Sequence, residues 1–144
     1  MSEVRVTAQQ KRAIAKRALD CCEYCRSQAR FSMQSFSIEH IVPLQKGGPT
    51  TLENLAFSCQ GCNGHKSIKT EGRDPVSRDL VPLYNPCRHR WKDHFTWNDN
   101  FARVLGLTEI GRATIETLHL NREGLVNLRR VLYARGEHPP SEPD

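Results

Sequence analysis

Residues 37–67 read SIEHIVPLQKGGPTTLENLAFSCQGCNGHKS, and this stretch decides the fold that we predict. The β-branched and alternating apolar residues of 36–42 predict a strand that Pro43 ends. Beyond a glycine-rich loop, residues 55–58 predict a returning strand, and residues 63–69 predict a short helix. The stretch therefore predicts the order strand, loop, strand, helix, within an α+β fold.

The chain of 144 residues has 6 cysteines, and four of them form two Cys-x-x-Cys pairs, one before this stretch and one within it. No apolar run approaches the roughly 20 residues that span a bilayer, and the first residues lack the apolar stretch of a secretion signal. We therefore expect a soluble, cytoplasmic protein that contacts no membrane. Because thiols stay reduced in the cytoplasm, such pairs are better explained as metal ligands than as disulfides. The predicted ligands of one structural zinc ion per chain are Cys22, Cys25, Cys59 and Cys62.

The predicted zinc has a scaffolding role, because four thiolates complete a tetrahedral site and leave no open position for water. An ion that closes the loop between the two pairs would add folding energy that a small core lacks. Cys21 competes with Cys22 in principle, but Cys22 has the better spacing to Cys25. Cys87 lies outside both pairs and is expected to be a free, partly buried thiol.

The chain is long enough for one compact domain and too short for a second independent core, so we expect a single domain. A helix is expected from Thr7, its N-cap, to about Leu19, with Leu19 on its apolar side. In the central stretch, Thr50 and Glu53 resemble a short capping box. The expected parts of the domain 1–144 are a core of about 7–70, a loop-like segment 71–87 and a C-terminal extension of about 80–135.

The C-terminal extension is predicted to contain a hairpin and two helices and to end in a flexible, proline-rich tail. Asn121 is the expected cap of the last helix, and Gly136 is its expected terminator. The predicted bounds are 91–105 for the hairpin with its turn at 98–100, 108–119 and 121–134 for the helices, and 136–144 for the tail.

A formal net charge of +5 favours a polyanionic partner, because lysine and arginine neutralise phosphates and release counterions. Charge alone is a weak signal, since many basic domains bind nothing charged. Arg12 and Lys16 lie outside the apolar side of the first helix, where they are either a solvated face or phosphate contacts. Nucleic acid is thus one expected partner.

Acidic, histidine and amide side chains gather between the cysteine pairs without an obvious core purpose. The order Glu-His-Ile-x-Pro, Gly-Gly, Asn-Leu and Cys-x-x-Cys-Asn-x-x-Lys resembles the motif of the HNH endonucleases. The resemblance implies a ββα-metal unit that hydrolyses phosphodiester bonds, with Mg²⁺ or Mn²⁺ beside the scissile phosphate. It implies duplex DNA as the expected substrate, nicked or cut to give 5′-phosphate and 3′-hydroxyl ends.

The resemblance also implies a role for each matching residue. His40 is the general base that activates water, a task suited to imidazole because its unperturbed pKa near 6.5 leaves it mostly neutral. Asn54 orients His40, either by a hydrogen bond or by fixing the loop beside it. Glu39 and Asn63 supply oxygens to the catalytic cation, and Lys66 contacts nucleic acid.

Two features of the motif leave alternatives open. The family often has histidine directly after the last cysteine, whereas this chain has Asn63 there and His65 two residues on. His65 is therefore a further metal ligand, a phosphate contact or a packing residue. Neighbouring strand residues point to opposite faces, so Glu39 and His40 serve one site only if the strand twists or ends there.

Residues 83–125 resemble the C-terminal extension of a group of small bacterial HNH proteins, a resemblance that implies no role for them. The alternative to a nuclease is a catalytically inactive, zinc-stabilised module that binds nucleic acid. The joint presence of the catalytic residue types argues against that alternative. A purely structural zinc protein leaves those residues and the positive charge unexplained.

Overall fold

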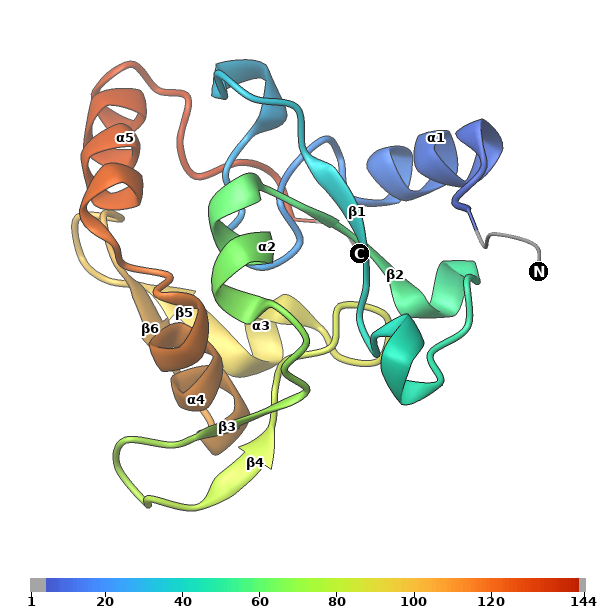
Figure 1. Cartoon of the computed structure of the whole chain (residues 1–144). Coiled ribbons are helices and arrows are strands. Elements are labelled where there is room, and N and C mark those ends of the chain that lie inside the picture. Colours follow the sequence, from blue (N-terminus) through green and yellow to red (C-terminus); the bar gives the residue numbers. More distant parts are fainter. Residues whose placement is uncertain (1–4, 143–144) are drawn as a thin grey trace.

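A β-hairpin followed by a short helix forms the centre of the computed structural model, which describes residues 5–142. β1 (Ser37–His40) pairs with β2 (Leu55–Ser58) in antiparallel register, and α2 (Gln60–Lys66) follows and packs against β1 (Figure 1). The predicted order of strand, loop, strand and helix is confirmed, as is the α+β class.

α2 lies across one face of β1 and begins earlier than predicted. The Cys59 Sγ accepts from the Cys62 N–H at 3.4 Å and caps the helix, which adds a turn before the predicted start. From that added turn, the Gln60 Nε2 donates to the Ser37 Oγ at 2.9 Å. Because side chains alternate along a strand, α2 covers the face of β1 that carries Ser37 and Glu39.

The N-terminal helix α1 (Ala8–Arg17) packs against β2 and has a complete capping box. The Gln10 N–H donates to the Thr7 Oγ1 at 3.0 Å, and the Gln10 Oε1 accepts from the Thr7 N–H at 2.9 Å. Ile14 is fully buried. The prediction that Leu19 lies on the apolar side of this helix is wrong: the helix ends at Arg17, and Leu19 has a φ of 55° and is 49% exposed.

The loop between β1 and β2 lacks the predicted capping box of Thr50 and Glu53. The residue before the short 3-10 turn Leu52–Asn54 is Thr51, and its side chain makes no capping hydrogen bond. The Thr50 hydroxyl instead contacts the His40 ring. The other short 3-10 turns are Ala29–Phe31 and Leu44–Lys46.

Residues 71–87, predicted to be loop-like, contain a second hairpin of β3 (Glu71–Arg73) and β4 (Leu80–Pro82). The prediction missed these strands because three residues are too few to show an alternating pattern. Arg112 holds the hairpin to the C-terminal part of the chain, since its Nε and Nη2 donate to the Asp74 carboxylate at 2.9 and 2.8 Å.

The C-terminal extension begins with the short helix α3 (Trp91–His94), which runs directly into β5 (Phe95–Trp97). β5 pairs with β6 (Val104–Gly106) in antiparallel register, so the predicted hairpin is confirmed. In the turn between β5 and β6, the Asn98 Oδ1 accepts from the Arg103 N–H at 3.0 Å, a side-chain contact typical of tight turns.

Two helices follow the hairpin as predicted, α4 (Glu109–Leu118) and α5 (Glu123–Ala134). The predicted capping role of Asn121 is wrong, because the N-cap position of α5 is Arg122. The Asn121 amide instead joins α5 to the hairpin: it accepts from the Val104 N–H at 2.7 Å and donates to the Val104 carbonyl at 2.9 Å. No helix in the described part of the chain is long and apolar enough to cross a membrane.

The chain leaves α5 through Gly136, whose φ of 73° confirms the predicted terminator. The segment 136–144 was predicted to be flexible. Within it, the Ser141 carbonyl accepts from the Arg26 Nη2 at 3.0 Å, beside the first cysteine pair. Residues 143–144 lie outside the described part.

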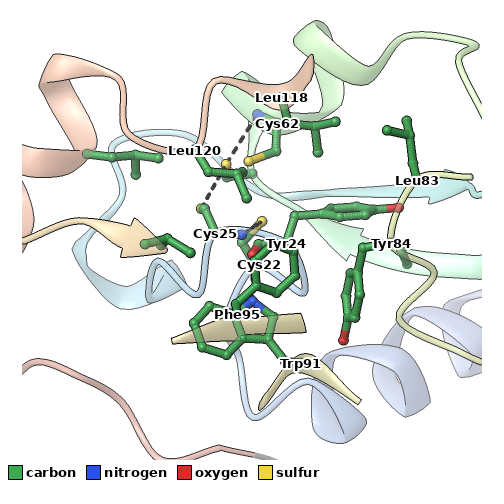
Figure 2. Close-up of a cluster of buried hydrophobic side chains, with 14 of the residues drawn as sticks. Cys22, Tyr24, Cys25, Cys62, Leu83, Tyr84, Trp91, Phe95, Leu118 and Leu120 are labelled. Atoms are coloured by element: carbon green, nitrogen blue, oxygen red, sulfur yellow. Dashed lines mark hydrogen bonds between the residues drawn. The ribbon is translucent and has the colours of Figure 1, made fainter. Parts of the chain in front are cut away.

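The main core surrounds the cysteines and joins them to the C-terminal extension. The Trp91 Nε1 donates to the Tyr24 carbonyl at 2.9 Å, so an aromatic residue of the extension closes over the first cysteine pair. Figure 2 shows that core, in which Cys22, Cys25 and Cys62 lie among Tyr24, Leu83, Tyr84, Trp91, Phe95, Leu118 and Leu120.

Candidate metal centre and active site

Four buried cysteines meet between the two Cys-x-x-Cys turns. Their Sγ atoms all lie within 4.8 Å of one another, and those of Cys25 and Cys59 are 3.7 Å apart. A tetrahedron with metal–sulfur arms of about 2.3 Å has edges of about 3.8 Å, so this spacing fits a single zinc ion. The cluster consists of the predicted ligands Cys22, Cys25, Cys59 and Cys62, which can hold a metal ion such as zinc.

The other two cysteines lie outside this cluster. Cys21 is buried, and its Sγ donates to the Leu19 carbonyl at 3.4 Å. Cys87 is half-buried, and its Sγ donates to the Leu52 carbonyl at 3.4 Å. Burial raises the pKa of both thiols. The preference for Cys22 over Cys21 is confirmed, and so is the expectation of a free, partly buried Cys87.

His40 stands at the end of β1, half-buried, with one ring nitrogen engaged. Its Nε2 lies 2.8 Å from the Thr50 Oγ1, and its Nδ1 makes no hydrogen bond within residues 5–142. Burial lowers the pKa of His40 from its ordinary value of 6.5, so the ring is neutral at pH 7. A neutral ring whose Nε2–H donates to Thr50 carries its lone pair on Nδ1, which can then accept a proton.

Thr50 is the residue of this site that sequence reasoning missed. A hydroxyl residue in the loop was the only signal, and it was assigned to a capping box. The Gln10 Nε2 donates to the Thr50 carbonyl at 3.2 Å, so α1 supports the residue that contacts His40.

Asn54 is buried beneath the same loop. Its Oδ1 accepts from the Val42 N–H at 2.9 Å, and its Nδ2 donates to the carbonyls of Val42 and Pro49 at 3.0 and 2.9 Å. A Cβ at Gly48 would lie 2.8 Å from the same Nδ2, so this close approach requires glycine. Of the two ways in which Asn54 was predicted to orient His40, the contacts match the one that fixes the loop.

Glu39 lies on the face of β1 that α2 covers, opposite the face of His40. Its carboxylate accepts from the Tyr24 hydroxyl at 2.5 Å and lies 3.6 Å from the Lys66 ammonium. Burial raises the pKa of Glu39 to about 7, against the opposing influence of the Lys66 charge. Strand alternation therefore separates the two adjacent residues, and the strand does not bring them to one side.

Lys66 is only 1% exposed, and its ammonium donates to the Ile41 carbonyl at 2.9 Å. The predicted contact between Lys66 and nucleic acid does not match this position, because α2 directs the side chain inward to Glu39. Burial lowers the pKa of Lys66, and the Glu39 charge opposes that shift.

Asn63 and His65 both lie on α2, in different surroundings. The Asn63 side chain is half-buried and makes no hydrogen bond in the described part of the chain. The His65 side chain is exposed, and its ring centroid lies 4.4 Å from that of His119. This contact is the packing role considered for His65; its metal and phosphate roles stay predictions.

The residues predicted to hold a catalytic cation fit that role only in part. Glu39 does not fit, because Tyr24 engages its Oε1 and Lys66 lies against its Oε2. Asn63 fits, because its amide oxygen has no partner within residues 5–142. Over the same residues, the cysteine cluster is the only group of three or more His, Cys, Asp or Glu side chains placed to share a metal ion.

The hairpin lies between two Cys-x-x-Cys turns, the second of which begins the helix, and a histidine ends the first strand. Together they define a ββα unit beside a cysteine cluster that can hold a metal ion. A family model described as HNH endonuclease matches residues 22–69, from the first ligand cysteine to just beyond α2. That segment of the chain is therefore similar to the HNH endonuclease family, whose members are usually nucleases that act on nucleic acid. A comparison with curated proteins gives no match.

Proposed function

We propose that the protein is a metal-dependent endonuclease in which His40 is the general base. It hydrolyses phosphodiester bonds, with duplex DNA as substrate, by nicking or cleavage that leaves 5′-phosphate and 3′-hydroxyl ends. The observation that carries the proposal is the state of His40, a neutral ring with Nε2 held by Thr50 and Nδ1 free, within a segment that matches the HNH family.

Proton transfer to His40 is the step that these residues support. An attacking water must lose a proton as it bonds to phosphorus, and a positioned base typically accelerates such a step by about 10²–10⁴-fold. Thr50 fixes the ring orientation through Nε2, and Asn54 fixes the loop that carries Thr50. In the tautomer whose Nε2–H donates to Thr50, Nδ1 remains the acceptor atom.

A hard divalent cation such as Mg²⁺ or Mn²⁺ supplies charge stabilisation at the scissile phosphate when it is bound. Asn63, whose side chain makes no hydrogen bond within residues 5–142, is the candidate to contribute an oxygen, and His65 on the same helix is a further candidate. Glu39 was predicted as a ligand, but its contacts with Tyr24 and Lys66 engage its carboxylate in the present arrangement.

The net charge of +5 supports a polyanionic substrate. Arg12 and Lys16 are exposed on α1, the helix whose Gln10 reaches the Thr50 carbonyl. They are the residues of this helix that we assign to phosphate contact.

Supercoiled plasmid incubated with purified protein and Mg²⁺ or Mn²⁺ should be nicked, and His40→Ala should lower the nicking rate by about 10²–10⁴-fold. The reason is that His40 is the group we propose takes the proton of the attacking water. Gel densitometry of the open-circle product over time measures the rate.

The matched control for this variant is His94→Ala. His94 is also half-buried and also contacts a threonine hydroxyl, its Nδ1 lying 2.7 Å from the Thr108 Oγ1, but it belongs to the C-terminal hairpin region. His94→Ala should nick at close to the wild-type rate. If wild type and His40→Ala nick at the same rate, His40 is not the general base. The activity then comes from a contaminating nuclease or from another base.

The pH dependence of nicking should reflect the environment of His40. A general base works in its neutral form, and burial lowers the pKa of His40 from 6.5. The rate should therefore be level from pH 7 to 8 and should fall as the pH drops through a midpoint below 6.5. Initial rates at saturating Mg²⁺ from pH 5 to 8 test this, and a rising limb centred above pH 7 contradicts it.

The second candidate function is a nucleic-acid-binding module without catalysis. The burial of Glu39 against Lys66 favours it, because that arrangement leaves the predicted cation site one ligand short. This candidate predicts binding that weakens steeply with salt and no cleavage with any divalent cation. Nicking that is lost in His40→Ala excludes it.

A further inference from the structure

Arg122, at the start of α5, reaches back across the molecule to the cysteine cluster. Its Nη2 lies 3.4 Å from the Cys59 Sγ and 3.7 Å from the Cys62 Sγ, and its Nη1 lies 3.6 Å from the Cys62 Sγ. The guanidinium is thus shared between the two thiols of the second cysteine pair. Arg122 belongs to the C-terminal extension, outside the segment that matches the HNH family.

Two features of the backbone hold the guanidinium in this place. The Nη1 also donates to the carbonyls of Leu118 and His119 at 3.3 and 3.1 Å, at the C-terminal end of α4. Gly61 lies between the two cysteines, and a Cβ there would be 2.4 Å from the Arg122 Nη2. The glycine therefore opens the space through which the guanidinium approaches the sulfurs.

The sulfur atoms differ in how many donors they have besides Arg122. The Cys25 N–H donates to the Cys22 Sγ at 3.5 Å, and the Cys62 N–H donates to the Cys59 Sγ at 3.4 Å. The Ser27 Oγ lies 3.0 Å from the Cys25 Sγ. For the Cys62 Sγ, the only N–H or O–H donors in the described part of the chain come from Arg122.

The positive charge of Arg122 opposes the negative charge of a zinc-bound cysteine cluster. Four thiolates around one Zn²⁺ carry a net charge of −2, and the four cysteines are no more than 8% exposed, so this charge lies out of water. A guanidinium bonded to two of the sulfurs offsets part of it. Arg129, a second buried cation of the extension, has its Nη2 3.4 Å from the Cys25 carbonyl, beside the first cysteine pair.

We propose that Arg122 is a positioning residue for the zinc centre: it donates hydrogen bonds to the thiolates of Cys59 and Cys62 and thereby sets how firmly the zinc is held. The C-terminal extension then controls metal retention in the family-matched segment. This role is independent of the proposed nuclease activity, because it concerns the metal that holds the scaffold.

The first test is the rate at which the full-length, zinc-loaded protein gives up zinc to a chromophoric chelator. Arg122→Gln should release zinc about 10–100-fold faster than wild type, in proportion to the loss of metal affinity that is typical when a group supporting a metal ligand is removed. Arg122→Lys, which keeps the charge but not the fork of donors, should be intermediate. The control is Arg130→Gln, which removes the same charge from an exposed position of α5 and should release zinc at the wild-type rate.

The second test is spectroscopic and separates a sulfur contact from a merely structural role. In the cobalt(II)-substituted protein, loss of N–H donors to sulfur raises the energy of the sulfur lone pairs. The sulfur-to-cobalt charge-transfer band of Arg122→Gln should therefore move to longer wavelength, and that of Arg130→Gln should not.

The proposal is overturned if Arg122→Gln releases zinc at the wild-type rate and its sulfur-to-cobalt charge-transfer band does not move. Faster release with an unmoved band overturns it as well, because the effect would then come from the packing of α4 and α5. If Arg122→Gln does not fold, Arg122→Lys decides by the same two measurements. Neither measurement uses nucleic acid, so its outcome does not depend on whether the protein is a nuclease.

Discussion

Replacing Cys59 by serine is expected to abolish zinc binding and cooperative folding together. Structural zinc sites contribute about 10–16 kcal/mol of apparent binding free energy, which is as large as the net stability of about 5–15 kcal/mol of a typical domain. The main core of this protein is built around the cysteines, so little is left to hold β1, β2 and α2 without the metal. Zinc content by elemental analysis and thermal unfolding by circular dichroism measure both losses.

Cys87→Ser is the matched control for Cys59→Ser. Cys87 is half-buried and lies outside the cluster, so this variant should bind zinc like wild type and unfold at nearly the same temperature. Zinc bound at full stoichiometry in Cys59→Ser, or a wild-type melting curve without zinc, contradicts the scaffolding role.

Glu39→Ala is expected to lower the free energy of unfolding by about 3–5 kcal/mol, the usual cost of removing one partner of a buried ion pair. The Lys66 ammonium, only 1% exposed, would keep the Ile41 carbonyl but lose its counter-charge. Urea unfolding of the zinc-loaded protein at pH 8 is the measurement, because Glu39 is ionised above its pKa of about 7.

Two further variants isolate the ion pair from the loss of volume. Glu39→Gln keeps the shape and an acceptor for Tyr24, so it should cost less than Glu39→Ala. The double variant Glu39→Gln with Lys66→Met removes both charges and should recover part of the stability lost in Glu39→Ala. If Glu39→Ala unfolds at the wild-type urea concentration, the buried pair does not stabilise the fold.

The same variants test the predicted role of Glu39 as a cation ligand. If Glu39 binds the catalytic cation, Glu39→Gln should need far more Mg²⁺ for half-maximal nicking while its stability changes little. If the contacts with Tyr24 and Lys66 describe its role, the change should appear in stability, and the Mg²⁺ requirement should stay close to that of wild type.

The central fold could be predicted because its signals are local. Each cysteine pair is spaced within one turn, the strand residues are β-branched or apolar, and Thr7 caps a helix through a residue three positions away. The hairpin β3–β4 escaped prediction because its strands are too short for a pattern, and it is held by a distant ion pair between Arg112 and Asp74.

The candidate site could be predicted by residue type but not by contact. His40 and Asn54 were identified, yet the partner of His40 proved to be Thr50, which the sequence assigned to a helix cap. The separation of Glu39 from His40 follows from strand alternation. The motif resemblance placed both residues in one site, which requires the strand to twist or end between them. Arg122 escaped notice because its partner Cys62 lies 60 residues away, and no local pattern links the two.

The hydrogen bond from the Trp91 Nε1 to the Tyr24 carbonyl has a consequence for where this molecule can be divided. A fragment cut just after residue 69 would end where the family match ends, but it would expose the apolar side of the first cysteine pair to water. Such a fragment would lack Trp91 and the other core residues of the C-terminal extension. We infer that it would not fold alone. The folding unit that we infer therefore extends beyond residues 22–69 into the C-terminal extension.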